Sequence, residues 1–542
     1  MNDGKKKVAK NSVIYSVISL FTKALGMIML PLYTNVKYIT GTEYGHYGVL
    51  SQFMFLGVFF ISLSLNNSAI RFYSDFKEDR EKVKKFFGTI MTFIILLGAS
   101  FVVLFTIFQK PLCRLLFDGI PFLPNVALTL ISLMFYAVYT TYQGFLQSMQ
   151  EGTRFARNGV GFVLLHVFLN VVFLVFFRNV SIGGYALGGL NGMMLSLTIS
   201  YTFFACVGLV ELVRKNEMKF CLDKDMLKLS LRYSLPLVPH SMANNMASYI
   251  PKLFLNKVDF ASGNVTIFTA IHSVAMQFSS AIDVCQSAIN NAQRPWFNDK
   301  MKNGEEGKKE IIEFTMVAMR LTVVVCLGVG LFSQELVLFV AKSPAYFEAW
   351  KIIPFFAMTH AVKAVYYNHS LAIMYDIRTN KKMFLCSGSG TLFNFLLTGT
   401  LVWWVFDMGI WGTAISFFTS RLLTAALSIL ICRKYDLLMY PLKKMFACVA
   451  ACGAACVAGI VPINWYVIAT TGSQITLFSS WFFINFAYKL VAFAVGTFLI
   501  VGDQRAEFVD FVKDLLLKMK NKHAPSPEAK ESDDTDDTEH NV

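Results

Sequence analysis

Long apolar stretches follow one another along almost the whole chain and are separated by short polar loops. A helix needs about 20 mainly apolar residues to cross the hydrocarbon core of a bilayer. The pattern therefore predicts an all-α polytopic membrane protein with about 14 transmembrane helices. The predicted spans are residues 12–33, 44–66, 86–108, 123–147, 158–178, 183–213, 231–255, 265–290, 311–334, 349–375, 383–406, 409–431, 445–467 and 480–501.

The basic residues lie mainly in alternate loops, and this bias predicts how the helices are oriented. Of the 49 Lys and Arg residues, 36 lie on the side of the N-terminal segment, every second loop and the C-terminal tail, and eight lie on the opposite side. Because basic loops resist translocation, both termini are predicted to be cytoplasmic. The net charge of +14 follows from this topology and not from a basic soluble domain, so no nucleic-acid partner is expected.

An internal repeat with an offset of roughly 220 residues relates spans one to six to spans seven to twelve. Because each repeat holds an even number of spans, the two halves share one orientation. Parallel repeats of this kind are a common transporter architecture, with the substrate held between the halves. The matched positions are Pro31 with Pro251, Asn170 with Asn394, and Gly184-x-x-x-Gly188 with Gly409-x-x-Gly412.

The repeat predicts two pseudo-symmetric six-helix lobes followed by additional elements. Beyond Val501, apolar residues recur at helical spacing among lysines, which is typical of a helix on a membrane surface. The last residues are acidic and almost free of apolar side chains, which predicts disorder. The predicted parts are an N-terminal lobe (1–215), a cytoplasmic linker (216–230), a C-terminal lobe (231–435), helices 13 and 14 (436–502), an amphipathic cytoplasmic helix (503–522) and a disordered acidic tail (523–542).

Several spans carry charged residues, and a charge at the centre of a bilayer costs about 2.5–3.5 kcal/mol. Lys23 lies midway along the first span. His360, Lys363 and Tyr367 share one face of the tenth span. Asp283, in the eighth span, is the only acidic residue deep within a predicted span, which makes it a candidate for binding a coupling ion.

Tyr139 and Gln143 share one face of the fourth span. Such side chains either bond to sugars in a polar cavity or bond between helices, and both interpretations stay open. Three further cations, Arg320, Arg421 and Lys489, lie in spans nine, twelve and fourteen. Buried cations therefore outnumber buried acids, and this excess favours an anionic ligand such as a pyrophosphate.

Several short, loosely defined sequence motifs along the first half of the chain resemble those of bacterial polysaccharide-biosynthesis flippases. This family belongs to the superfamily that also contains the MATE drug exporters and the lipid II flippase, and the resemblance covers about residues 8–500. The segments that carry it are Lys10-Asn11-Ser12, Pro31-Leu32-Tyr33, Gly41-Thr42-Glu43-Tyr44-Gly45-His46-Tyr47-Gly48, Arg71-Phe72-Tyr73 and the stretch from Asn170 to Gly184.

The resemblance implies a MATE-like fold that alternates between inward- and outward-open states in the bacterial inner membrane. The implied cargo is an undecaprenyl-pyrophosphate-linked oligosaccharide, moved to the outer leaflet for a surface polysaccharide such as lipopolysaccharide O-antigen or capsule. In relatives, cations of the central cavity hold the pyrophosphate, and Lys23, Arg71, Lys252 and Lys363 are the nearest candidates here. The implied partners are this substrate, membrane lipids and a polysaccharide polymerase complex.

Two other functions, drug antiport and glycan polymerisation, fit the sequence less well than a flippase does. A MATE-type antiporter of cationic drugs needs buried carboxylates, but no acid lies deep in spans one to six. A membrane glycan polymerase is expected to carry a large extracytoplasmic loop, and the loops of this chain are short. Because the chain shows no P-loop, metal-protease motif or paired carboxylates, neither an ATP-driven pump, an enzyme nor a cofactor is predicted.

Overall fold

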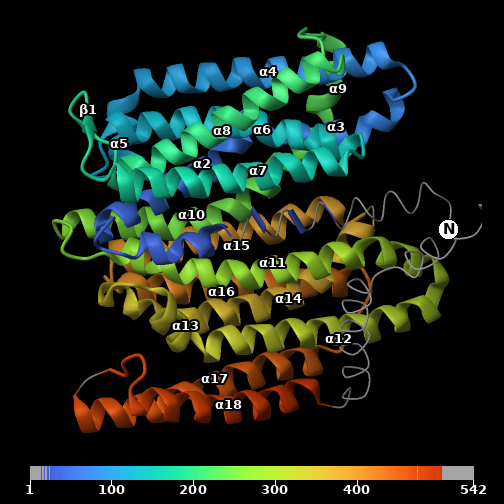
Figure 1. The fold of residues 1–542 in the computed structure, drawn as a ribbon. Coiled ribbons are helices and arrows are strands. Elements are labelled where there is room, and N and C mark those ends of the chain that lie inside the picture. The colour runs from blue at the N-terminus through green and yellow to red at the C-terminus, as the bar shows by residue number, and fades with distance from the viewer. Residues whose placement is uncertain are drawn as a thin grey trace, which may run out of the picture.

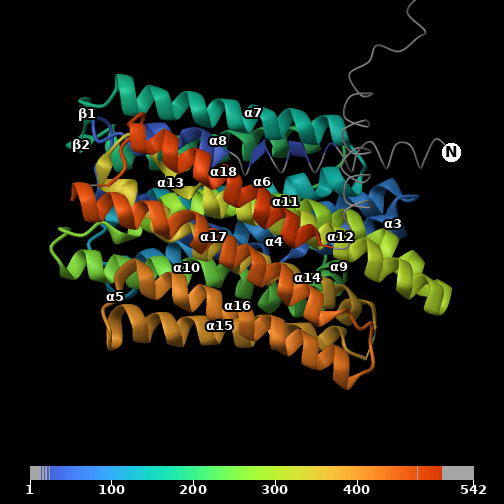
Figure 2. The same cartoon turned by 90° about the horizontal axis from the view of Figure 1, so that it is seen from below.

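The computed structural model describes residues 25–502, except Ile377 and Ser473, together with five positions between residues 14 and 22. The molecule is a bundle of long helices that run side by side (Figures 1 and 2). Lys23, the predicted surface helix (503–522) and the acidic tail (523–542) lie outside the described residues.

The first group of helices, called here the first lobe, runs from the helical residues 25–33 to α8. Short π-helical turns at Phe122–Val126 and Val172–Phe176 flank α6 and α7, and a small antiparallel hairpin, β1 (Ser181–Ile182) and β2 (Tyr185–Ala186), precedes α8. The helices are α2 (Gly41–Ser62), α3 (Leu65–Phe76), α4 (Arg80–Ile107), α5 (Gln109–Leu116), α6 (Ala127–Ser148), α7 (Gly152–Val171) and α8 (Gly189–Arg214).

A short helix, α9 (Lys224–Ser234), leads into the second lobe, which runs from α10 to α16, and two further helices follow it. The helices are α10 (Val238–Ala261), α11 (Phe268–Lys300), α12 (Gly304–Leu331), α13 (Ser333–Val340), α14 (Ile353–Tyr375), α15 (Met383–Thr398), α16 (Gly409–Lys434), α17 (Leu442–Thr471) and α18 (Ser480–Val501). The last two pack against each other and against α12.

The predicted all-α membrane architecture is confirmed, whereas the number of spans stays a prediction. Each predicted span from the second to the fourteenth coincides with a long helix. Among the described residues, ten helices are long and apolar enough to cross a membrane. The helices α10, α11 and α14 fall below that criterion because polar side chains interrupt their apolar runs, and these same helices carry most of the candidate site.

The predicted start of the sixth span at residue 183 is wrong. Gly183 and Gly184, with φ angles of +61° and +83°, form the turn of the hairpin, and α8 begins only at Gly189. Two consecutive positive φ angles define the turn that best fits the twist of a two-residue hairpin. Gly184, which the repeat matched with Gly409, therefore lies in this turn and not in a helix.

The second predicted span is also interrupted. Leu63 and Ser64 have φ angles of +45° and +57°, and this left-handed pair separates α2 from α3. The corresponding helix of the second lobe, α11, is continuous over 33 residues. Beyond the break, α3 packs on α6, as α2 does, and also on α9.

Matched contacts in the two lobes agree with the internal repeat. The hydroxyl of Tyr33 donates to Oδ1 of Asn170 at 3.1 Å, so α7 is tied to the first helix. The amide of Asn394 donates to the carbonyl of Ala247 at 3.2 Å, so α15 is tied to α10. Both asparagines are fully buried. Each therefore joins the fifth helix of its lobe to the first.

A second matched pair of positions lies where α8 and α16 begin. Gly189 and Gly409 both have positive φ angles, +59° and +52°. A Cβ atom at Gly189 would lie 2.1 Å from Oε1 of Glu43, and one at Gly409 would lie 2.8 Å from the ring of Phe268. Both neighbours belong to the first turn of the second helix in the respective lobe. Both the positive φ angle and the close approach favour glycine at these positions.

Alanine at Gly189 or Gly409 is expected to lower the free energy of unfolding by about 2–4 kcal/mol, because it adds a steric clash to backbone strain. Chemical denaturation in mixed micelles measures the effect. The matched control is Gly263→Ala, where φ is +69° but nothing lies within 4 Å of an added Cβ, and about 1 kcal/mol is expected. If Gly189→Ala and Gly263→Ala lowered the free energy of unfolding equally, the close contact between Gly189 and Glu43 would be contradicted.

Candidate functional site

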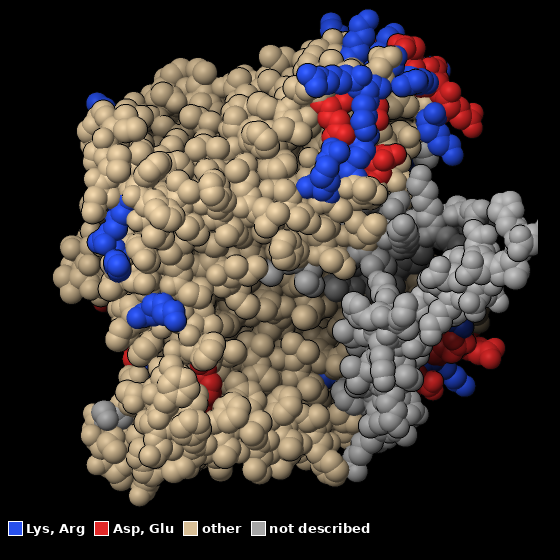
Figure 3. Space-filling view, in the orientation of Figure 1, with Lys and Arg blue, Asp and Glu red and all other residues tan. Residues whose placement is uncertain are grey.

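The two lobes meet near the end of the bundle that carries the β1–β2 hairpin, called here the hairpin end. The other end, where α3, α9 and the start of α4 gather many Lys and Arg side chains, is called the basic end (Figure 3). At the hairpin end, α2 packs against both α10 and α11. Gly45 and Gly48 allow this approach, since a Cβ atom at either would lie within 3.3 Å of Thr269 or Ser273.

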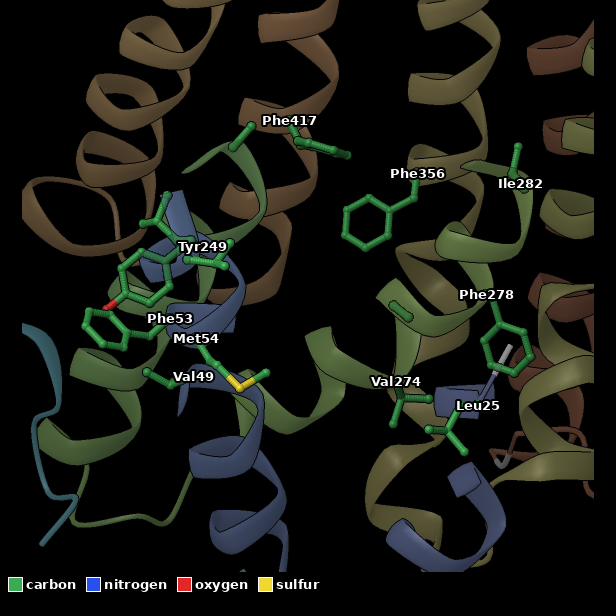
Figure 4. Close-up of a cluster of buried hydrophobic side chains, with 14 of the residues drawn as sticks. Leu25, Val49, Phe53, Met54, Tyr249, Val274, Phe278, Ile282, Phe356 and Phe417 are labelled. Carbon is green, nitrogen blue, oxygen red and sulfur yellow. The ribbon is translucent and has the colours of Figure 1, made fainter. Parts of the chain in front are cut away.

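Buried apolar side chains from both lobes fill this junction. Phe53 of α2 packs against Tyr249 of α10, with ring centroids 6.2 Å apart. Leu25 of the first helix lies beside Val274 and Phe278 of α11 (Figure 4). Water is excluded from these layers, so the hairpin end is closed in this structure.

Polar contacts across the same junction form a latch, defined by Leu116 and Asp118 of the first lobe and Tyr249, Asn256 and Lys257 of α10. The Lys257 ammonium pairs with the Asp118 carboxylate at 2.6 Å. The amide of Asn256 donates to the carbonyl of Asp118 at 2.9 Å, and the hydroxyl of Tyr249 donates to the carbonyl of Leu116 at 3.4 Å. The lobes cannot separate at this end without breaking these bonds.

Asp118→Asn is expected to shift the lobes toward a state open at the hairpin end by about 1–2 kcal/mol, a five- to thirtyfold change in the ratio of states, because a charge-assisted bond is lost. Distance measurements between probes on the exposed positions Ile182 and Val265 report the shift. Asp376→Asn, which breaks an ion pair within the second lobe, is the control. An unchanged distance distribution in Asp118→Asn would contradict the latch.

The second lobe contains a buried polar cluster between α11 and α14. Nε2 of His360 lies 2.8 Å from the hydroxyl of Ser279, and its Nδ1 lies 3.3 Å from Oε1 of Gln286. One turn along α14, the Lys363 ammonium forms an ion pair with Asp283. The lysine side chain is 12% exposed and the aspartate side chain 33%. The pair is therefore enclosed on the lysine side and reachable from the aspartate side.

Aromatic rings accompany the cations of this lobe. The Lys363 ammonium lies 4.8 Å from the ring centroid of Tyr367, and the Arg421 guanidinium lies 5.4 Å from that of Phe417. Both distances are within the range of cation–π attraction. The structure thus brings together His360, Lys363, Tyr367 and Asp283 of the predicted site.

The other predicted site residues lie elsewhere. Lys252 is buried near the hairpin end, where its ammonium donates to the carbonyl of Gly48 at 3.1 Å. Arg71 lies near the basic end, exposed and 3.3 Å from Asp75. In the first lobe, Tyr139 and Gln143 are buried and bond to each other at 2.7 Å. One small headgroup cannot contact all of these residues at once.

The predicted excess of unpaired buried cations needs a correction. Lys489 lies 2.9 Å from both carboxylate oxygens of Glu335, which α13 carries into the bundle. Arg320 donates to the carbonyl of Val501 at the end of α18, a favourable position for a cation at a helix C-terminus. These two cations stabilise the packing of α18 on the second lobe and are not candidates for substrate binding.

A cavity of about 20 Å³, large enough for one water molecule, adjoins the Lys363 cluster. Its polar lining includes Asn290, Gln293 and Asn368, each with a buried side-chain atom that has no hydrogen-bond partner among the described residues. Gln293 was missed in the sequence. It follows Asp283, Gln286 and Asn290 at steps of three or four residues, so it lies on the same face of α11 as Asp283.

Two lobes of membrane helices joined through a polar latch, with a charged cluster inside one lobe, are typical of a transporter. A family model described as polysaccharide biosynthesis protein matches residues 8–301, more than half of the chain. The chain therefore belongs to the polysaccharide biosynthesis protein family, and the resemblance seen in its sequence is confirmed. No curated protein sequence matches it.

Solved structures of two transporter types share the fold. The lipid II flippase MurJ in an inward closed conformation has a TM-score of 0.64 at 13% identity, covering 90% of this chain and 99% of its own. An inward-facing multidrug resistance transporter of the MATE family has a TM-score of 0.54 at 14% identity, covering 76% and 94%. A third relative, from Pyrococcus furiosus, is described as a MOP superfamily transporter with a binding pocket of reversed polarity (TM-score 0.52, 15% identity, covering 80% and 95%). The MATE-like fold is thus confirmed, and these relatives are transporters and not enzymes.

Proposed function

We propose that the protein is a flippase that moves an undecaprenyl-pyrophosphate-linked oligosaccharide from the cytoplasmic to the outer leaflet of the bacterial inner membrane. The observation that carries this proposal is the Asp283–Lys363 pair in a member of the polysaccharide biosynthesis family. An enclosed lysine neutralised by a partly exposed carboxylate is a site where an incoming anion can replace the carboxylate. The basic end would face the cytoplasm, as the distribution of Lys and Arg favours.

In this mechanism the pyrophosphate meets cations at three successive levels of the bundle. Arg71, exposed at the basic end, would make the first contact with the headgroup. Lys363 would then hold it within the second lobe, and Lys23 is a further cation proposed to hold it. Lys252, which bonds to Gly48 while the hairpin end is closed, would become accessible once the latch opens.

Displacement of Asp283 from Lys363 offers a route to energy coupling. A carboxylate that loses its cationic partner in a partly buried site binds a proton or a metal cation more readily. Asp283, once separated from Lys363, would therefore be able to bind a coupling ion. His360 and Tyr367 would bond to the sugar or phosphate beside Lys363, and Tyr139 and Gln143 would line the first lobe.

Export of a MATE-type cationic drug is the second candidate, and it is favoured by the MATE structure among the relatives. The first lobe argues against drug export, because no acidic residue lies deep within its predicted spans.

If the protein is a flippase, the glycan that it carries would serve O-antigen, capsule or another surface polysaccharide, and a polysaccharide polymerase would be the partner that receives this glycan.

Thermal stabilisation of the purified protein in mild detergent tests the proposed substrate class. Undecaprenyl pyrophosphate is expected to raise the melting temperature, and a panel of lipophilic organic cations is not. Lys23→Ala should reduce the stabilisation, because one of the cations proposed to hold the headgroup is lost. Stabilisation by the organic cations alone would reject the flippase and support drug export.

A further inference from the structure

The short helix α9 between the two lobes exposes two adjacent rows of side chains. Lys224, Lys228 and Arg232 recur at four-residue steps, and all three are exposed. Beside them, Leu229 and Tyr233 are each 39% exposed. A helix that shows a basic row next to an apolar row is typical of the boundary between headgroups and acyl chains.

The apolar surface continues on both sides of the helix. Leu222, before α9, is 49% exposed, and Leu235 and Leu237, after it, are 47% and 37% exposed. These side chains are too apolar to face water together without cost. A membrane at this level would cover them.

The segment before α9 packs on α4, and this contact sets the depth of α9 in the membrane. The uncharged run of α4 from residue 86 to residue 107 is about 33 Å long, which matches a hydrocarbon core of about 30 Å. At the start of this run, a Cβ atom on Gly88 would lie 1.8 Å from the carbonyl of Lys219, and the backbone N–H of Asp223 donates to the hydroxyl of Thr89 at 3.1 Å. The linker therefore reaches α9 at the edge of the hydrocarbon core.

The helix α9 is held by a cap at its own N-terminus and by a ring contact with the first lobe. Asp223 caps its N-terminus by accepting bonds from the backbone N–H groups of Asp225 and Met226, each at 3.0 Å. The rings of Tyr233 and Phe72 of α3 lie edge to face with centroids 5.5 Å apart. The exposed rows are thus held in one orientation, and Lys and Arg side chains gather over this corner of the molecule (Figure 3).

We propose that α9 is a binding surface for anionic phospholipids of the leaflet at the basic end. The ammonium and guanidinium groups of Lys224, Lys228 and Arg232 contact lipid phosphates, while Leu229 and Tyr233 insert among the acyl chains. Because α9 connects α8 to α10, the bound lipids hold the link between the lobes at a fixed depth. This surface is separate from the Lys363 cluster and does not depend on the proposed cargo.

The test compares the full-length protein with two triple variants in neutral detergent, using native mass spectrometry with added phosphatidylglycerol or phosphatidylcholine. The wild type is expected to prefer phosphatidylglycerol. K224Q/K228Q/R232Q should bind it about a hundredfold more weakly, a factor of about five for each cation, and should bind phosphatidylcholine unchanged. All three side chains are exposed, so the variant should keep its melting temperature in phosphatidylcholine.

The matched control, K381Q/K434Q/K443Q, removes the same charge from exposed positions at the basic end of the second lobe and of α17. It is expected to retain most of the preference for phosphatidylglycerol. Equal losses in the two triple variants would show a diffuse charge effect and overturn the assignment to α9. A wild type that binds both lipids equally would overturn it as well.

Discussion

Lys489→Met is expected to lower the free energy of unfolding by about 3–5 kcal/mol, because it leaves the buried carboxylate of Glu335 without its cation. Lys489 is fully buried about 14 Å from the start of α18, too deep for its ammonium to reach water. Besides Lys489, Glu335 accepts a bond from Asn485 at 2.8 Å. Chemical denaturation in mixed micelles measures the loss.

A second variant separates this effect from a simple loss of packing. Lys489→Met combined with Glu335→Gln removes both charges and keeps similar volumes, so most of the lost stability should return. Lys443→Met, at an exposed position of α17, should change stability by less than about 0.5 kcal/mol. If the double variant were as unstable as Lys489→Met alone, the ion pair would not explain the effect.

Lys363→Met is expected to reduce transport about 10- to 100-fold, because a charge-assisted contact to the substrate headgroup is worth about 1.5–3 kcal/mol. The measured quantity is the initial rate of lipid-linked saccharide translocation in proteoliposomes. Lys363→Arg keeps the positive charge and should recover part of the rate. Lys342→Met, at an exposed loop position, should transport normally.

The same substitution also breaks the pair with Asp283, and a double variant distinguishes the two roles. Lys363→Met with Asp283→Asn removes the uncompensated carboxylate and should restore the melting temperature of the wild type. Transport should stay low, because the cation that holds the headgroup is still absent. Normal transport by the double variant would show that Lys363 serves only to stabilise the second lobe.

Much of the fold could be predicted from the sequence because a bilayer imposes simple requirements. An apolar run of the right length must be helical in the membrane, so the positions of most helices followed from composition alone. The repeat was visible because residues such as Asn170 and Asn394 make matched contacts between the first and fifth helices. The hairpin before α8 escaped because its residues are as apolar as those of a span.

The site was harder to predict, because pairing depends on which helices become neighbours. Lys363 and Asp283 are 80 residues apart, and Lys489 and Glu335 are 154 residues apart. Sequence position alone could not tell which carboxylate each buried cation would pair with. Gln293 lies on the same face of α11 as Asp283, but only the packing of α11 against its neighbours shows that it lines the cavity.

The break between α2 and α3 was equally invisible in the sequence. Leu63 and Ser64 are not residues that favour a left-handed backbone, so only the surrounding structure can hold them there. The consequence is an asymmetry between the lobes. The second helix of the first lobe is divided into α2 and α3, whereas its counterpart α11 is continuous and carries Asp283.

The central claim is that this chain moves an anionic lipid-linked saccharide across a bilayer, and one measurement tests it most directly. Purified protein is reconstituted in vesicles with a fluorescent undecaprenyl-pyrophosphoryl sugar, and a membrane-impermeant quencher reports the label in the outer leaflet. The account predicts protein-dependent redistribution between leaflets that Lys363→Met slows at least tenfold. Redistribution equal to that in protein-free vesicles, together with transport of an organic cation by the same vesicles, would contradict it.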